Sequence, residues 1–503
     1  MRQELPAAPA RPARRWTLLV VSLAQLMAVL DATIVNVALP SVQQGLGVAD
    51  AERHWAVTAY SLALGGSLLL GGRVCGALGH RRSFAAGLIG FAAASALGGA
   101  AGDAGTFFAA RALQGLSAAL MAPAALALLS MTFPDPRERG RAFGVFAGVG
   151  AGGAALGVVS GGLLTEYAGW RWCLYINVPM AALALLGTPL LRRDRPGRGP
   201  LRLDLPGVLL SAAGIAALVG GLSQAESRGW GDPLVLLPLL GGAGLLALFA
   251  RVEARARHPL LPPGIVLHRV RGIAFVSVGL MFTAMFGFFL FMSYYTQTVL
   301  GYTAVGAGLT LLVNAAASVV GSTVVAGRLL VRADPRTVVV AALLSSAAGI
   351  LILTRLTADS AHVLVVYLLP AQVLTGIGLG CLLATAANLV TSGTGPADAG
   401  VASGAYNAVQ QVGAALGTAL FNSVATAGAA AYAASRESGP EALSAGAVHG
   451  YTAALWAAFA LLACGALAVG ALSREDADRA GPVLERQSTE GENDHEPPQV
   501  RRP

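Results

Sequence analysis

The chain has 503 residues, of which 55% are hydrophobic and 12% are charged; its net charge is +8 and its mean hydropathy is +0.65. Soluble domains carry about 25% charged residues, so this composition leaves too little polar surface for a water-soluble fold. All 34 basic residues are arginine, and the lack of lysine excludes a Walker A ATP site and a pyridoxal-phosphate Schiff base.

Long apolar stretches follow one another along the whole chain, and a helix needs roughly 20 such residues to cross a bilayer. The sequence therefore predicts an all-α integral membrane protein with about 14 transmembrane helices. The predicted spans lie near 16–39, 55–74, 83–101, 105–131, 142–164, 170–191, 205–223, 233–251, 272–298, 303–330, 336–356, 361–391, 397–427 and 449–473.

The arginines favour one orientation of these spans. With a cytoplasmic N-terminus, 28 arginines fall in cytoplasmic segments and five in outer loops. Because arginine gathers on the cytoplasmic side, we expect both termini in the cytoplasm of a bacterial plasma membrane. This distribution accounts for the positive charge without nucleic acid as a partner.

Asp31 is an acid within the first predicted span, where an ionised carboxylate costs about 2.5–3.5 kcal/mol on insertion scales. Arg111 lies within the fourth span. At the helical rise per residue, Asp31 lies roughly 12 Å and Arg111 roughly 9 Å from the outer ends of their spans, so an ion pair is geometrically possible. We predict that the pair couples transport to protons. The alternatives are that Asp31 only packs helices and that Arg111 snorkels to the outer interface.

Polar side chains at membrane depth are candidates for lining a substrate cavity, because without partners they would cost energy in lipid. These candidates are Gln25, Asn36, Gln114, Asn314, Asn407 and Gln411. Tyr294, in an aromatic-rich span, is a further candidate, although aromatic residues more often face lipid or the interface.

Four stretches carry a family resemblance. They are Leu30–Pro40 (LDATIVNVALP), Arg111–Gly115 (RALQG), a glycine ladder over 144–162, and Trp170–Pro179 (WRWCLYINVP). These stretches resemble motifs of the fourteen-span drug:proton antiporter branch of the major facilitator superfamily. The resemblance implies two six-helix bundles with two inserted helices, no cofactor, and transport driven by the proton gradient.

Two motifs depart from the family pattern. The ladder keeps the spacing of the antiporter motif at Gly144, Gly153, Gly157, Gly161 and Gly162, but Val158 replaces the family's proline. In the loop 72–81, Gly76 stands where the family has an acid that helps to latch one conformation. Close helix packing alone is the alternative explanation of the glycines.

The resemblance divides the chain into five segments. They are a cytoplasmic N-terminal segment (1–15), an N-terminal six-helix bundle (16–191), a linker with two inserted helices (192–271), a C-terminal six-helix bundle (272–473) and a disordered cytoplasmic tail (474–503). The tail is expected to be disordered because it is polar and poor in apolar residues.

The function that these patterns favour is proton-coupled efflux of an antibiotic or drug-like compound, with lipid, protons and this small molecule as partners. Span 303–330 lacks the acid that some relatives exporting divalent cations carry, so we expect monovalent cationic or neutral substrates. An uptake symporter on the same fold and a non-transporting sensor remain alternatives. An enzyme is not expected, because no catalytic triad, metal cluster or ATP site is evident in the sequence.

Overall fold

A computed structural model describes residues 11–48, 52, 55–191, 205–256, 259, 261–356, 360, 362–392, 396–434 and 446–471, and every regular element in these ranges is helical. The α-helices are α1 (Arg11–Leu46), α2 (Trp55–Leu78), α3 (His80–Gly99), α4 (Ala104–Thr132), α5 (Pro136–Tyr167), α6 (Trp172–Tyr175), α7 (Asn177–Gly187), α8 (Leu205–Arg228), α9 (Pro233–Glu253), α10 (Pro263–Val266), α11 (Arg269–Tyr294), α12 (Ala304–Val320), α13 (Ala326–Arg332), α14 (Pro335–Leu353), α15 (Leu369–Thr391), α16 (Pro396–Ala434) and a last helix, Gly446–Ala471. One 3-10 turn, η1 (Thr188–Leu190), and three π-helical turns, η2 (Tyr295–Val299), η3 (Gly321–Val325) and η4 (Leu364–Leu368), adjoin them.

Thirteen helices within the described residues are long and apolar enough to cross a membrane. The helix α3 is not among the thirteen, although it lies between α2 and α4 in the chain and packs against α4. A helical segment lies at every predicted span, but the count of fourteen spans stays a prediction. The helix α1 begins at Arg11, inside the segment predicted to precede it, whereas the predicted tail 474–503 lies outside the described residues.

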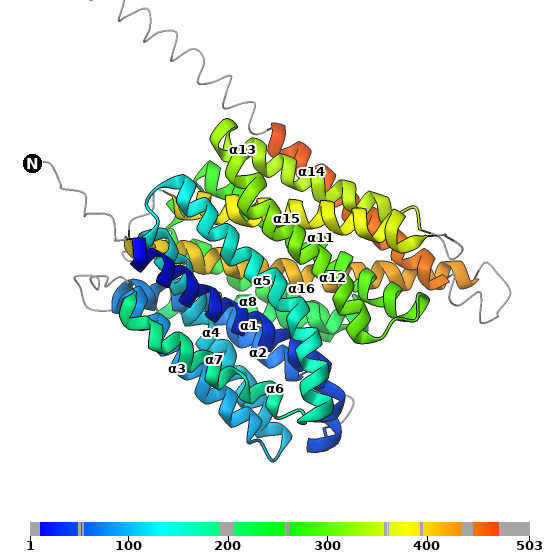
Figure 1. Ribbon diagram of the computed structural model, residues 1–503, viewed down its shortest axis with the longest axis horizontal. Coiled ribbons are helices and arrows are strands. Elements are labelled where there is room, and N and C mark those ends of the chain that lie inside the picture. The colour runs from blue at the N-terminus through cyan, green and yellow to red at the C-terminus, as the bar shows by residue number, and fades with distance from the viewer. Residues whose placement is uncertain are drawn as a thin grey trace, which may run out of the picture.

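The long helices form two groups that lie side by side (Figure 1). The helices α1–α7 pack with one another, as do α11–α16. Helix α8 contacts α2 of the first group and α16 of the second, and α9 packs on α8. The two helices of the predicted linker therefore cover the seam between the groups.

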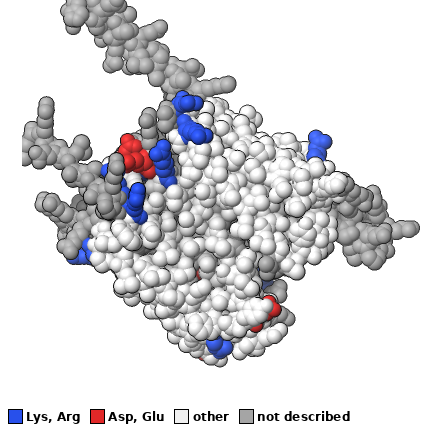
Figure 2. All heavy atoms as spheres, viewed as in Figure 1, with Lys and Arg blue, Asp and Glu red and all other residues white. Residues whose placement is uncertain are grey.

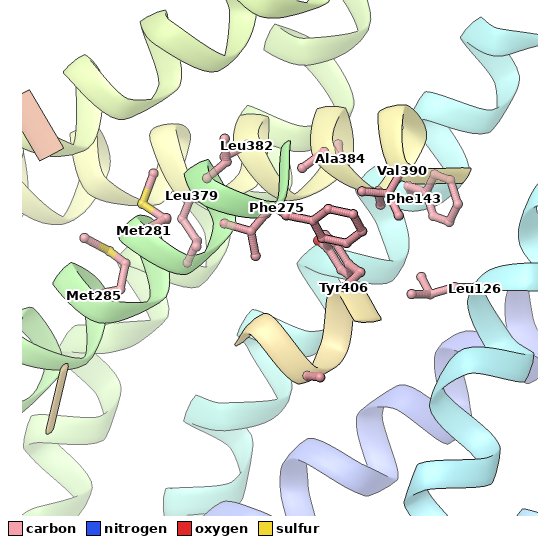
Figure 3. Packing of buried hydrophobic residues seen from close by; sticks show 14 of the residues in the cluster. Leu126, Phe143, Phe275, Met281, Met285, Leu379, Leu382, Ala384, Val390 and Tyr406 are labelled. Carbon is pink, nitrogen blue, oxygen red and sulfur yellow. The ribbon is translucent and has the colours of Figure 1, made fainter. Parts of the chain in front are cut away.

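One apolar cluster crosses from one group to the other. Figure 3 shows Leu126 of α4 and Phe143 of α5 near Phe275 of α11, Val390 of α15 and Tyr406 of α16, all of them buried. Apolar side chains pack without fixed directions, so this contact can hold the groups together in more than one relative position.

Polar contacts join the groups at the end where α1 begins. Arg139 of α5 donates from Nε to Asn388 Oδ1 over 2.7 Å and from Nη2 to Ser392 Oγ over 2.8 Å. Beside them α2 and α16 are so close that a Cβ at Gly72 would lie 2.5 Å from the carbonyl oxygen of Gly400. The groups are therefore in direct contact at this end.

Charged side chains are sparse on the face of the molecule in Figure 2, which is mostly uncharged. The basic residues of that face gather mainly near the beginning of α1, with few at the opposite end. A wide uncharged belt between two charged rims suits a protein that crosses a bilayer.

The α5 glycines face two different neighbours. A Cβ at Gly153 or at Gly161 would lie 3.1 Å from the nearest atom of α1, and one at Gly157 would overlap α1. Gly144 instead faces the second group, where Ser322 Oγ donates to its carbonyl oxygen over 2.8 Å. The ladder therefore allows close packing within the first group and, at Gly144, between the groups.

We expect Gly157→Ala to destabilise the protein, because the added methyl overlaps α1 and overpacking costs about 1–3 kcal/mol. The measurement is the melting temperature of the purified protein in detergent. Gly152→Ala is the matched control on the same helix, since its Cβ would have no atom within 4 Å. Equal melting temperatures for the two variants would contradict the close α1–α5 packing.

Candidate functional site

An ion pair lies buried inside the first group of helices. Asp31 of α1 is 0% exposed and Arg111 of α4 is 1% exposed, and Arg111 Nη1 lies 2.6 Å from Asp31 Oδ2. The depths estimated from the sequence thus correspond to direct contact. Burying two charges is costly unless they are paired and most of their remaining polar atoms are hydrogen-bonded, so the site depends on the groups that surround the pair.

The other carboxylate oxygen of Asp31 accepts two further hydrogen bonds. Gln114 Nε2 of α4 donates to Asp31 Oδ1 over 2.9 Å, and Asn177 Nδ2 of α7 donates to the same oxygen over 2.7 Å. Ser95 Oγ of α3 accepts from Gln114 over 2.7 Å and from Asn177 over 3.3 Å. Three amide and guanidinium donors around one carboxylate suit its ionised form.

Arg111 also connects the site to α2. Its Nε donates to the carbonyl oxygen of Ala56 over 2.9 Å, and its guanidinium lies 4.8 Å from the ring centre of Tyr60. Its Nη1 additionally donates to Gln114 Oε1 over 2.7 Å, while Nη2 is buried without a partner. The guanidinium is thus held inside the bundle, which rules out the alternative that it snorkels to the interface.

Local sequence explains how α4 presents these groups. Arg111 and Gln114 are three residues apart, so they lie on one face of the helix. The next residue, Gly115, leaves room for α2, because a Cβ there would overlap the backbone of α2. Asp103 caps the start of α4 by accepting from Thr106 Oγ1 over 2.7 Å and from Thr106 N over 2.8 Å, and these two hydrogen bonds lower the pKa of its exposed carboxyl.

The candidates for substrate lining are spread over the molecule. Gln114 is fully buried within the ion-pair network, and Asn314 is buried between α12 and α15, where it donates to Gln372 O and Thr375 Oγ1. The half-buried candidates are Gln25, Asn407, Gln411 and Tyr294, and Asn36 is exposed. No hydrogen bond among the described residues joins these candidates into one cluster, so their role in lining a cavity stays a prediction.

The remaining motif positions lie on α5. Gly144, Gly153, Gly157 and Gly161 are buried at the helix contacts described above, and Gly162 is half-buried. Val158, at the position of the family's proline, faces α12, where a Cβ at Gly308 would lie 3.0 Å from Val158 Cγ1. The valine and the glycine therefore fit together as a knob and a hole.

Two site residues were not among the predicted candidates. Asn177 lies in the stretch Trp170–Pro179, but only the family resemblance drew attention to that stretch. Ser95 lies in a run of alanine and glycine and gives no signal in the sequence. Both are fully buried and reach the carboxylate group only through the tertiary packing of α3 and α7 against α1 and α4.

The sequence profile of the Major Facilitator Superfamily matches residues 21–418 of the chain. The chain belongs to this superfamily. It is 54% identical over 444 residues to the puromycin resistance protein pur8 of Streptomyces alboniger, covering 88% of each chain. It is 39% identical over 420 residues to the cephamycin export protein CmcT of Amycolatopsis lactamdurans, covering 80% of this chain and 84% of that protein.

A solved structure of the proton:xylose symporter XylE, also of the major facilitator superfamily, has the same fold, with a TM-score of 0.62 at 14% identity over 91% of this chain and 95% of that chain. The family match and the relatives named for export make the chain a multi-pass membrane transporter rather than an enzyme, and the predicted superfamily is confirmed.

Substitutions of Asp31 and Arg111 should have strongly non-additive effects on the free energy of unfolding. Arg111→Met leaves the carboxylate of Asp31 buried without its cation, and breaking such a pair costs about 3–5 kcal/mol. We expect the double variant Asp31→Asn/Arg111→Met to lose less than the sum of the two single losses, because no lone charge remains. Unfolding of the four proteins in a detergent titration measures this coupling.

Strict additivity of the two losses would show that the side chains do not interact. Arg171→Met is the control, because this arginine is exposed, stacks on Trp170 and takes no part in the pair. We expect its effect to be small.

Proposed function

We propose that the chain exports an antibiotic or drug-like compound in exchange for protons, and that Asp31 carries the proton. The observation that supports this most is a fully buried carboxylate paired with an arginine where α1, α3, α4 and α7 meet. The relatives of the chain are named for antibiotic resistance and export, which favours efflux as the direction of transport. A carboxylate held by charge-assisted bonds can be neutralised by a single proton, and this changes every contact in the network.

Protonation of Asp31 would weaken its attraction to Arg111. The guanidinium would then depend on its remaining contacts, two of which, Ala56 O and the Tyr60 ring, belong to α2. Helix α2 also packs on α16 of the other group, where Gly72 meets Gly400. A change in the ion pair therefore reaches the seam between the groups through one helix.

Coupling requires that the proton and the substrate bind differently to the inward and outward states. If the arginine-rich end is cytoplasmic, the contacts of Arg139 close the molecule on the cytoplasmic side. Opening that side would break the hydrogen bonds of Arg139 to Asn388 and Ser392. In our proposal, a proton taken up by Asp31 from outside releases the substrate outward, and return of the proton to the cytoplasm resets the cycle.

The proposed substrate is a monovalent cation or a neutral compound. The relative at 54% identity is a puromycin resistance protein. A single exchangeable carboxylate can balance one positive charge, and the segment 303–330 contains no second acid. Puromycin is therefore the first compound to test.

In energised everted vesicles, we expect addition of puromycin to release protons from the lumen when the wild-type protein is present. Asp31→Asn should abolish this release, because an amide cannot take up the proton. Asp103→Asn is the matched control, since it makes the same substitution at an exposed helix cap, where asparagine caps equally well. The readout is the recovery of the fluorescence of a pH-sensitive dye.

Each other outcome has a defined meaning. Proton release that survives Asp31→Asn would leave antiport standing and remove Asp31 as the carrier. Substrate and protons moving in the same direction would favour the uptake symporter instead. Binding of puromycin without any transport would favour the sensor.

The charge limit on the substrate can be tested with two closely related dyes. We expect efflux of the monovalent cation ethidium to exceed efflux of the dication propidium at least tenfold, because one carboxylate leaves the second charge uncompensated. Dye efflux from energised cells expressing the protein measures this, with cells expressing Asp31→Asn as the baseline. Equal export of both dyes, lost for both in Asp31→Asn, would overturn the proposal that the substrate carries at most one positive charge.

A further inference from the structure

The surroundings of Asp31 pose a problem for its protonated form. The three groups that bond to its carboxylate, Arg111 Nη1, Gln114 Nε2 and Asn177 Nδ2, all donate a hydrogen, and none of them is an acceptor. A protonated carboxyl carries an O–H group of its own, which needs an acceptor. A site that takes up and releases a proton must therefore present donors in one state and an acceptor in the other.

The acceptors near Asp31 are not equally available. Gln114 Oε1 already accepts from Arg111 over 2.7 Å, and Ser95 Oγ already accepts from Gln114 and Asn177. Asn177 Oδ1 is buried and has no hydrogen-bond partner. A buried amide oxygen without a partner is costly, and it is the acceptor that a protonated Asp31 lacks.

We propose that Asn177 is an amide switch that responds to the proton on Asp31. In the ionised state its Nδ2 donates to Asp31 Oδ1, as the structure has it. When Asp31 takes up a proton, the amide of Asn177 turns by half a rotation and its Oδ1 accepts the new O–H bond. The proton comes from the medium and returns to it, and the amide keeps both of its hydrogens.

The same rotation gives Ser95 a second role. Its hydroxyl oxygen lies 3.3 Å from Asn177 Nδ2. After rotation the amide oxygen stands in that place, and the hydroxyl of Ser95 can donate its hydrogen to it. Asn177 Oδ1 then accepts two hydrogen bonds, while Nδ2 gives up its bonds to Asp31 and Ser95 and moves to the place that Oδ1 leaves.

Among the side chains that the structure describes, few other charged or titratable groups face Asp31 from the helices around it. Arg111 faces it from α4, Tyr60 lies near it on α2, and Cys173 lies near it on α6; Ser95 on α3 does not titrate. Below a pH of about 8, phenol and thiol groups are ordinarily uncharged and guanidinium is charged. A pH response in the acidic to neutral range therefore belongs to Asp31.

The first test is the pH dependence of puromycin-driven proton release in Asn177→Leu, which is similar in size but has no donor or acceptor. Hydrogen bonds to charged groups are stronger than those to neutral groups, so removing Asn177 weakens the ionised form more than the protonated form. We expect proton affinity to rise about tenfold, which moves the midpoint of the pH profile up by about one pH unit.

The second test separates a rotating amide from a fixed donor. Infrared difference spectra between acidic and neutral pH contain the carboxylic C=O band of protonated Asp31, identified by its loss in Asp31→Asn. In Asn177→Leu this band should shift, because the O–H bond has lost its acceptor, and the side-chain amide signal that accompanies it should vanish. A band at the wild-type position would overturn the switch.

Matched variants make the outcome decisive. Gln372→Leu removes a fully buried amide from α15 of the other group and should move neither the midpoint nor the band. Asn177→Thr restores a group that both donates and accepts, so it should return the midpoint toward wild type; it also serves if Asn177→Leu does not fold. An unchanged midpoint in both Asn177 variants would refute the inference.

This inference rests on the proposed proton-carrying role of Asp31, and the two can fail separately. Proton release that persists in Asp31→Asn refutes the proposed carrier. Loss of release in Asp31→Asn, with Asn177→Leu behaving like wild type, refutes only the switch.

Discussion

A buried ion pair organises the first group of helices. Asp31 cannot lie at this depth without a cation and hydrogen-bond donors, because neither lipid nor apolar side chains can replace them. Arg111, Gln114 and Asn177 meet this need from α4 and α7, and Ser95 joins them from α3. The relative positions of four helices are therefore fixed by one carboxylate group.

The second group is built differently. Among the described residues of α11–α16, the buried polar side chains are all uncharged serines, threonines, asparagine and glutamine, such as Asn314, Thr375 and Gln372. A neutral group can be hydrogen-bonded to its own helix backbone, as Thr375 Oγ1 is to Ala371 O over 2.7 Å. The buried ion pair thus lies in the first group, and the described buried polar side chains of the second group are neutral. The apolar cluster across the seam opposes relative movement only weakly, which suits a transporter whose halves must move.

Sequence patterns could locate the helices and the two charges, but not the whole site. Long apolar stretches fall on helices throughout, and equal depth was enough to pair Asp31 with Arg111. Gln114 was expected in a substrate cavity, although its spacing of three from Arg111 already put both on one helix face. Asn177 and Ser95 could not be found in this way, because a neutral polar residue in an apolar run can also satisfy itself locally or face a neighbouring helix. Their role depends on how α3 and α7 are rotated, which hydrophobicity at these positions does not determine.

The two departures from the family motifs illustrate how packing can compensate for a missing residue. Gly76 removes an acid from the α2–α3 region, yet the groups still meet at that end through Arg139, whose partners Asn388 and Ser392 are neutral. Hydrogen bonds between a charged donor and neutral acceptors are weaker than an ion pair, so this end should open more easily than one latched by opposite charges. Val158 in turn replaces a proline with a side chain that fills the space over Gly308. A helix contact of this kind depends on shape rather than on a kink, and a change at either position alone would leave a gap or an overlap in the seam.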